Sequence, residues 1–326
     1  MRKLGFNHIN AKTVDEAVRL LQKYRGKAKL IAGGTDLLGV LEHRILPAWP
    51  EAIINIKTIP GQHYIKEDTE GLRIGALTKL SDIAKSETVR QKYKLLAEAA
   101  EAVATPQIRN MGTIGGNLCQ DVRCWYYRYP HHLGGRILCY RKGGKGCPAA
   151  TGENQYQSIF GGSRGCMAVN PSDIAVALLA LEARIEIASP RGVKVIPIED
   201  FFGSFGNVLK SDEMVTEIQV PRPLDRARQM FLKSRSRKAI DFATVSVASV
   251  ITVNNGICEE ARIALGAVAP RPFRITKAEE AIKGKTINLA AAEEAAAAAV
   301  RNAIPLHKNA YKVELVKALV KGALLS

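Results

Sequence analysis

Two glycine-centred stretches contain the residue types that bind an anion without any catalytic side chain. They are residues 30–37, LIAGGTDL, and residues 104–117, ATPQIRNMGTIGGN. Because glycine has no Cβ, the backbone at each Gly-Gly pair can turn its N–H groups towards an anion. Neither stretch has the lysine of a Walker loop or the G-x-G-x-x-G of a Rossmann unit. Each alone could be a tight turn, but two together fit the diphosphate of a dinucleotide better than a single phosphate.

Cysteine is concentrated in one part of the chain. Five of the six cysteines fall within a Gly-, Arg- and Tyr-rich stretch of little periodicity: Cys119, Cys124, Cys139, Cys147 and Cys166. A long irregular stretch inside a domain needs a source of order. The expected intracellular location disfavours disulfides, and the C-x-x-C pairs typical of zinc sites are absent. An iron–sulfur cluster tolerates wider spacing, so a metal site is favoured, with free structural cysteines as the alternative.

No pattern of a substrate-processing site occurs. The sequence has no G-x-S-x-G, no H-E-x-x-H, and no serine or cysteine with an obvious base. We therefore expect no catalytic side chain, and the chemistry would belong to a bound cofactor.

Composition limits the class of protein and of partner. The 326 residues carry 47 Lys and Arg against 31 Asp and Glu, a net charge of +16. No nucleic-acid-binding motif accompanies this charge, so acidic protein partners are favoured over nucleic acid. No apolar run approaches the roughly 20 residues that span a bilayer, and the N-terminus lacks the apolar core of a signal peptide. A cytoplasmic location without membrane contact is expected.

Periodicity predicts the elements that position the two glycine stretches. A helix over 13–24, capped by Thr13, precedes a strand over 28–32 that ends in the first stretch. Pro106 is expected to keep the preceding helix out of the second stretch. Further strands are predicted over 51–56 and 72–75 and in ARIEIAS and VKVIPI, and further helices over 78–84, 93–103 and 170–181. Residues 218–223 are expected to close the first unit, with PRP as the linker. Two strand-like runs and two helices, over 289–303 and 311–325, then predict an α+β C-terminal domain.

Together, LIAGGTDL and ATPQIRNMGTIGGN resemble the two FAD-binding loops of the flavoprotein subunits of the xanthine dehydrogenase and carbon monoxide dehydrogenase family. The resemblance extends over nearly the whole chain. It implies an α+β fold with a two-part FAD-binding domain of the PCMH/vanillyl-alcohol-oxidase type over 1–223, divided near residue 57 into about 1–57 and 58–223. A smaller α+β domain of the CO dehydrogenase flavoprotein type would follow over 224–326.

The resemblance also implies which residues contact FAD. Asp173, in the motif PSD, could accept from a ribityl or ribose hydroxyl, or it could simply cap a helix. Lys233 could stabilise negative charge on a reduced flavin, or it could be an ordinary surface lysine. The implied contacts are Leu30, Ile31, Ala32, Gly33, Gly34, Thr35, Asp36, Leu37, Val103, Ile108, Thr113, Ile114, Gly115, Gly116, Asn117, Asp173, Val215 and Lys233.

An insertion over about 118–168 resembles that of the 4-hydroxybenzoyl-CoA reductase branch, which binds a [4Fe–4S] cluster. In that branch the second cysteine of NLC-x-D-x-R-C is a ligand, and the sequence here reads NLCQDVRC. The resemblance therefore implies four ligands, Cys124, Cys139, Cys147 and Cys166. Because the segment between the last two is longer than expected, Cys119 remains the alternative fourth ligand.

These features predict an FAD-binding electron-transfer subunit of a molybdenum hydroxylase-type complex. Its partners in a hetero-oligomer would be a molybdopterin-binding large subunit and a [2Fe–2S] small subunit. Electrons would pass between the [2Fe–2S] partner and an external carrier such as ferredoxin, through FAD and the [4Fe–4S] cluster. Two alternatives remain: a stand-alone FAD oxidoreductase with a zinc-stabilised loop, and a basic nucleic-acid-binding protein.

Overall fold

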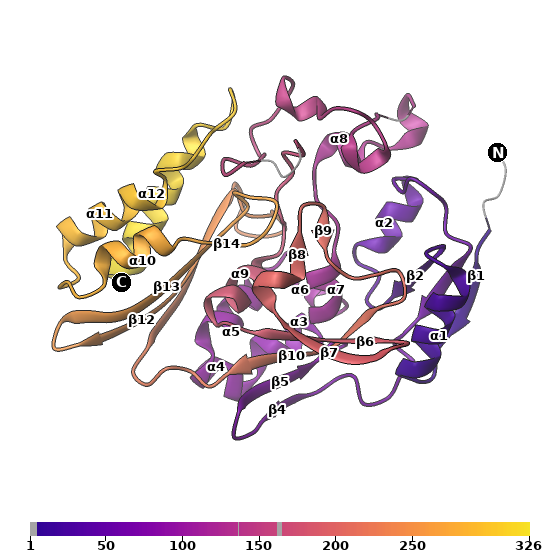
Figure 1. Cartoon of the computed structure of the whole chain (residues 1–326), viewed down its shortest axis with the longest axis horizontal. Helices are drawn as coiled ribbons and strands as arrows, with labels where there is room; N and C mark the ends of the chain where they lie inside the picture. The colour runs from indigo at the N-terminus through magenta and orange to yellow at the C-terminus, as the bar shows by residue number, and fades with distance from the viewer. Residues whose placement is uncertain (1–4, 136, 162–164) are drawn as a thin grey trace.

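The computed structural model describes residues 5–135, 137–161 and 165–326. Figure 1 shows three regions side by side, with the N-terminal sheet at one end and the last three helices at the other. The cysteine-rich insertion lies over the central region. No helix within the described ranges is long and apolar enough to cross a membrane.

The N-terminal region is a three-stranded parallel sheet with two helices. Its strands, in the order β1-β3-β2, are β1 (Asn7–Asn10), β3 (Ala52–Asn55) and β2 (Ala28–Ile31). Helix α1 (Val14–Tyr24) begins after Thr13, whose hydroxyl accepts from the Glu16 amide at 3.0 Å. The first glycine stretch connects β2 to α2 (Leu37–Glu42), so the predicted strand before that stretch is confirmed.

The central region is a five-stranded antiparallel sheet in the order β4-β5-β10-β6-β7. The strands are β4 (Ile65–Glu67), β5 (Gly71–Gly75), β10 (Met214–Pro221), β6 (Arg184–Ser189) and β7 (Gly192–Pro197). The helices that share one hydrophobic core with this sheet are α3 (Leu80–Lys85), α4 (Glu87–Lys92), α5 (Lys94–Glu101), α7 (Ile114–Cys119) and α9 (Asp173–Ala180). β10 is the last of these strands in the sequence, but it lies at the centre of the sheet and pairs with both β5 and β6. The sheet is therefore complete only when residues 214–221 have paired.

The second glycine stretch is helical, which differs from our expectation of a loop. Thr105 caps α6 (Pro106–Arg109), and Thr113 caps α7. Pro106 occupies the first turn of α6, where its missing N–H costs nothing, so it begins a helix as well as ending the preceding segment. Gly115 and Gly116 consequently lie in the first turn of α7 rather than in a turn between elements.

The C-terminal region is the expected α+β unit. Its antiparallel sheet follows the order β11 (Arg228–Ser234), β12 (Val245–Asn254), β13 (Ile257–Gly266) and β14 (Phe273–Arg274). Its helices are α10 (Thr276–Ile282), α11 (Leu289–Ala299) and α12 (Tyr311–Leu325), which bury their apolar side chains against β12 and β13. Helix α9 packs between the central and C-terminal regions.

The insertion has little regular structure in its described residues. It contains α8 (Trp125–Arg128) and three 3₁₀ turns, η1 (His131–Leu133), η2 (Tyr140–Lys142) and η3 (Pro148–Ala150). Its second half is attached to the C-terminal region. Asn309 Nδ2 donates to the carbonyls of Gln157 and Ser158, both at 3.1 Å, and Lys312 Nζ donates to the Tyr156 carbonyl at 2.9 Å. Backbone N–H groups of Ile159 and Phe160 also donate to the Val268 carbonyl, at 2.9 and 3.1 Å, so the segment is attached by main chain and side chains together.

A small hairpin completes the surroundings of the site. It consists of β8 (Phe202–Gly203) and β9 (Gly206–Asn207), and it follows the 3₁₀ turn η4 (Ile198–Phe201). The chain then passes through residues 208–213 into β10.

Candidate functional site

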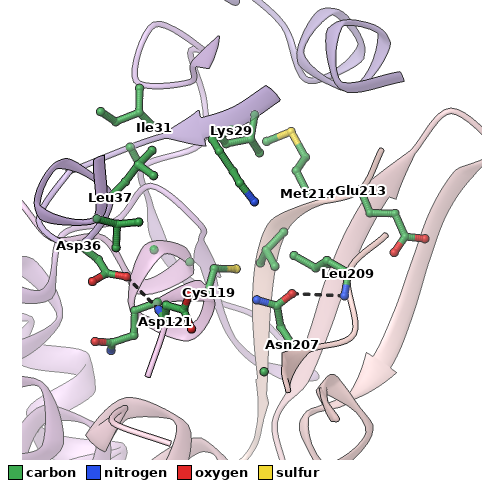
Figure 2. Close-up of a pocket in the computed structure, with 18 of the residues that line it drawn as sticks. Lys29, Ile31, Asp36, Leu37, Cys119, Asp121, Asn207, Leu209, Glu213 and Met214 are labelled. Carbon is green, nitrogen blue, oxygen red and sulfur yellow. Dashed lines mark hydrogen bonds between the residues drawn. The ribbon is translucent and has the colours of Figure 1, made fainter. Parts of the chain in front are cut away.

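A cleft of about 700 Å³ lies between β2, α7, the β8–β9 hairpin and the insertion. This volume is within the roughly 300–1,000 Å³ range of ligand and cofactor sites. Figure 2 shows side chains from β2, the first glycine stretch and β10 converging on it. The predicted FAD contacts that line the cleft are Leu30, Ile31, Ala32, Gly33, Gly34, Thr35, Asp36, Leu37, Thr113, Gly115, Gly116 and Val215.

The first glycine stretch offers free backbone donors to this cleft. Within the described ranges, the N–H groups of Gly33, Gly34 and Thr35 donate to no protein acceptor. Gly34 has a φ of +74°, a backbone conformation that L side chains rarely adopt. Unpaired N–H groups beside a cleft need an acceptor from outside the polypeptide, and a phosphate oxygen satisfies that need.

In the second glycine stretch, the N–H groups of both residues of the Gly-Gly pair are already occupied. Gly115 N–H donates to the Ala76 carbonyl at 3.0 Å, and Gly116 N–H donates to Thr113 Oγ1 at 3.2 Å. The expectation that both glycine pairs form anion-binding nests is therefore wrong for Gly115 and Gly116. Here glycine permits close packing, since a Cβ on Gly115 would lie 3.0 Å from the Ala76 carbonyl oxygen.

The two stretches also pack against each other. A Cβ on Gly33 would lie 2.0 Å from the carbonyl oxygen of Met111, which is closer than any real contact. Leu80 N–H donates to the Gly112 carbonyl at 3.0 Å and fixes that backbone to the central region. Gly33 therefore fixes the position of the first stretch relative to α7, and both border the same cleft.

Arginines of the insertion hold the first stretch by its carboxylate. Asp36 Oδ1 lies 2.7 Å from Arg128 Nη2 and 2.9 Å from Arg123 Nη2. Asp36 Oδ2 accepts the backbone N–H of Asp121 at 2.9 Å, a contact drawn in Figure 2. Burial lowers the pKa of Arg123 to about 10. The insertion is therefore a structural part of the cleft.

Four of the five insertion cysteines surround a second, smaller cavity. Cys124, Cys139, Cys147 and Cys166 line a space of about 10 Å³, room for about one water. Burial raises the pKa of Cys124, whose sulfur accepts from Gln157 Nε2 at 3.6 Å.

The side chains around this cavity suit a metal cluster better than a single metal ion. No three His, Cys, Asp or Glu side chains in the described ranges are arranged to hold a single metal ion. Four thiols with no competing carboxylate are the donor set of a [4Fe–4S] cluster, which distributes its thiolates over four irons. The four thiols therefore fit a cluster in kind and number of donors.

Cys119 lies elsewhere. It is on α7 and lines the larger cleft, where Figure 2 shows its sulfur, and it does not line the cysteine cavity. Burial raises the pKa of its thiol to about 12, so it stays protonated near neutral pH.

The wall between the two cavities is formed by three residues of the insertion. Tyr127, Tyr140 and Arg141 line both the cleft and the cysteine cavity. The Tyr127 hydroxyl donates to the carboxylate of Asp121, and burial raises its pKa, so this tyrosine is neutral. The residues that could hold a dinucleotide and those that could hold a cluster are therefore neighbours.

Some predicted FAD contacts do not line the cleft: Val103, Ile108, Ile114, Asn117, Asp173 and Lys233. Ile114 is fully buried in the central core. Lys233 Nζ lies 2.6 Å from Asp173 Oδ2, and both side chains are 5% exposed. Burial raises the pKa of Asp173, although Lys233 acts in the opposite direction. The assignment of these six residues to the flavin stays a prediction.

Several residues that line the cleft are not among the FAD contacts predicted from the sequence. Lys29, in β2, extends its side chain into the cleft, and Met214 and Glu213 border it at the start of β10 (Figure 2). Asn207 and Leu209 border it after the β8–β9 hairpin. The Gly-Ser-Phe-Gly turn at residues 203–206 could have indicated this segment, because closely spaced glycines often mark backbone close to a ligand.

Comparisons with known proteins agree along the whole chain. Residues 4–223 match the FAD binding domain in molybdopterin dehydrogenase, and residues 230–326 match the CO dehydrogenase flavoprotein C-terminal domain. The aldehyde oxidoreductase FAD-binding subunit PaoB of Escherichia coli (strain K12) is 34% identical, with 84% of this chain and 85% of that protein covered. The carbon monoxide dehydrogenase medium chain of Hydrogenophaga pseudoflava is 31% identical, with 98% and 96% covered. A solved structure of carbon monoxide dehydrogenase from that organism superposes with a TM-score of 0.79 at 29% identity, with 100% of this chain and 98% of that chain covered.

Proposed function

Because the chain belongs to the family of FAD-binding subunits of molybdenum hydroxylases, we propose that it passes electrons through FAD and a [4Fe–4S] cluster held by its insertion. The family assignment gives an oxidoreductase subunit that binds FAD. The observation that supports the cluster is that Cys124, Cys139, Cys147 and Cys166 line one cavity, whose wall is shared with the cleft.

The residues of the cleft would bind and orient the cofactor. The free N–H groups of Gly33, Gly34 and Thr35 would donate to the diphosphate of FAD. Asp36 is neutralised by two arginines, so it does not repel that diphosphate. FAD, when bound, supplies exchange between electron pairs and single electrons, which no side chain of this chain can provide.

The shared wall would separate the two centres while keeping them close. Tyr127 is 4% exposed and packs beside Cys139 and Cys166 in one apolar cluster. Such a wall excludes water from the cysteines, and the polarity around a cluster tunes its potential. Cys166 is the proposed fourth ligand, because Cys119 borders the other cavity.

The partners follow from the family as proposals. The large molybdopterin subunit and the [2Fe–2S] small subunit would be separate chains of one hetero-oligomer, since this sequence has neither a pterin site nor the C-x4-C-x2-C run of plant-type [2Fe–2S] proteins. An acidic external carrier such as ferredoxin would exchange electrons with the cluster. Arg123, Arg128 and Arg141 do not serve as its docking charges, because all three are turned inward to Asp36 or Asp121.

Other parts of the proposal rest on the sequence. The closeness to the 4-hydroxybenzoyl-CoA reductase branch depends on the NLCQDVRC pattern. The domain boundaries near residues 57 and 223 and the cytoplasmic location also stay predictions.

Anaerobic purification followed by iron, zinc and flavin analysis tests this function. We expect about four irons per chain, one FAD and an absorbance typical of a [4Fe–4S] centre. Cys124→Ser, Cys139→Ser, Cys147→Ser and Cys166→Ser should each lower the iron content. Cys119→Ser and Cys258→Ser are the controls and should keep it, since Cys119 borders the cleft and Cys258 is buried in the C-terminal core.

The alternatives give different results. Stoichiometric zinc without iron would favour a stand-alone flavoprotein with a zinc-stabilised loop. Iron loss in Cys119→Ser and not in Cys166→Ser would change the ligand set and keep the function.

A further inference from the structure

Arg141 is a buried cation whose surroundings do not satisfy it. It lies on η2, two residues after Cys139, and its side chain is 6% exposed. Its Nη1 donates to the Phe205 carbonyl at 2.9 Å and lies 3.4 Å from Asp121 Oδ1. Its Nε and Nη2 are buried and have no hydrogen-bond partner within the described residues.

The neighbouring charge does not fully compensate this guanidinium. Asp121 is the carboxylate in contact, and it also accepts the hydroxyl of Tyr127. The guanidinium otherwise lies against aromatic faces, 5.9 Å from the ring centre of Tyr127 and 5.5 Å from that of Phe205. A buried donor without an acceptor costs free energy, and more so when it is charged. An acceptor that is not part of the polypeptide would remove that cost.

The position of Arg141 indicates which acceptor this is. The residue lines the cysteine cavity together with all four proposed ligands. Its two unpartnered N–H groups are buried, and the residue follows Cys139 by two positions, so the guanidinium is joined through a short backbone segment to one of the four cysteines. Thiolates and sulfides of a bound cluster are anionic acceptors, and a site of four thiolates needs nearby positive charge.

We propose that Arg141 is a positioning residue of the cysteine cavity, which donates its Nε–H and Nη2–H to the sulfur atoms of an anionic iron–sulfur cluster and sets its reduction potential. This inference rests on the proposed function. A one-electron reduction makes the cluster more negative, so a fixed cation next to it favours the reduced form. Arg141 also borders the cleft, and one side chain thereby faces both proposed centres.

The test is a redox titration of anaerobically purified protein, followed by electron paramagnetic resonance, on wild type and three variants. Arg141→Met keeps the length of the side chain and removes the charge, whereas Arg141→Lys keeps the charge and loses the planar fork. Arg90→Met is the matched control. It removes the same charge from an exposed position on α4, a helix that lines neither cavity.

The proposal predicts a lower cluster potential in Arg141→Met. The equilibrium constant for reduction should fall about tenfold, which is 59 mV for a one-electron couple. Arg141→Lys should show a smaller shift in the same direction, and Arg90→Met should show none. The dissociation constant of FAD should be unchanged in all three variants, because the donors proposed for the diphosphate are backbone groups of the first glycine stretch.

Three outcomes would overturn the proposal in distinguishable ways. Wild type without iron would reject the cluster and this role of Arg141 together. Iron-loaded Arg141→Met with an unchanged potential would reject the role of Arg141 and leave the cluster intact. A weaker affinity for FAD and ADP with an unchanged potential would show that this cation serves the diphosphate. If Arg141→Met does not fold, Arg141→Lys decides through the same potential measurement.

Discussion

Asp36 of the first glycine stretch and Arg128 of the insertion form an ion pair at 2.7 Å across 92 positions of sequence. Their side chains are 17% and 18% exposed, so the pair is largely withdrawn from solvent. A stretch that leaves its backbone N–H groups free for a ligand is thus held through its side chain. The insertion contributes only a few of the residues that line the cleft, but its arginines hold the first glycine stretch in place.

Asp36→Asn should weaken the attachment of the insertion to the first glycine stretch. Two arginines would lose a charged acceptor, which costs about 1.5–3 kcal/mol per charged hydrogen bond. We expect a lower free energy of unfolding and faster loss of FAD, measured by urea denaturation and by FAD fluorescence on dilution. Glu70→Gln is the control, because Glu70 lies at the tip of the β4–β5 hairpin and is exposed. Identical FAD retention in both variants would contradict the role given to Asp36.

Gly33→Ala should damage the contact between the two glycine stretches. The added Cβ would meet the Met111 carbonyl at 2.0 Å, so the backbone must shift. We expect a loss of about 1–3 kcal/mol in the free energy of unfolding, the usual cost of overpacking, together with lower FAD occupancy.

Gly39→Ala is the matched control for that substitution. Gly39 lies on α2, six residues further along, and a Cβ there meets nothing within 4 Å. Alanine is the better helix former, so stability should rise by up to about 1 kcal/mol. If Gly33→Ala behaves like Gly39→Ala, close packing of the stretches does not position the cleft.

Lys233→Met should make stability depend on pH through Asp173. Removing one partner of a buried ion pair costs about 3–5 kcal/mol. Burial already raises the pKa of Asp173, and without Lys233 it would rise further. The folded state then binds a proton that the unfolded state releases, so the stability of the variant should fall as pH increases from about 4.

Denaturation of Lys233→Met and wild type between pH 4 and 8 measures this effect. The difference between them should be smallest at the acid end and should widen as pH rises. The double variant Asp173→Asn with Lys233→Met should recover most of the loss at neutral pH, since no buried charge remains. A difference that does not change with pH would mean that Asp173 stays ionised in a site wetter than the 5% exposure indicates.

Lys312 gives a dependence on pH of the opposite sign. It is fully buried and donates to the carbonyls of Tyr156 and Ala267, and burial lowers its pKa to about 7. Between pH 7 and about 10 the unfolded chain binds a proton that the folded chain does not, so stability should rise with pH, by up to about 1.4 kcal/mol per unit. Lys312→Met should remove this rise, whereas Lys317→Met, at an exposed ion pair on the same helix, should keep it.

Local patterns were sufficient to predict many of the elements. Helix α1 followed from apolar spacing and its Thr13 cap. The assignment of Cys124 and Cys166 to one metal group came from a resemblance and stays a prediction. The state of Gly115 did not follow, because its N–H is occupied by Ala76, a residue of another element. Arg128 is likewise turned inward by a residue of another element, since it pairs with Asp36 across 92 positions of sequence. Contacts between distant positions decided these features, and no local pattern encodes them.

The attachment of the insertion to the last helix has a consequence for biosynthesis. Residues 156–158 are fastened by Asn309 and Lys312, which are translated about 150 positions later. Until the C-terminal region is synthesised, those carbonyls lack these donors, and the insertion is held by its contacts with Asp36 and by its own ion pairs. A chain truncated before α12 would therefore keep the attachment of the insertion at the cleft and lose the one next to the cysteine cavity.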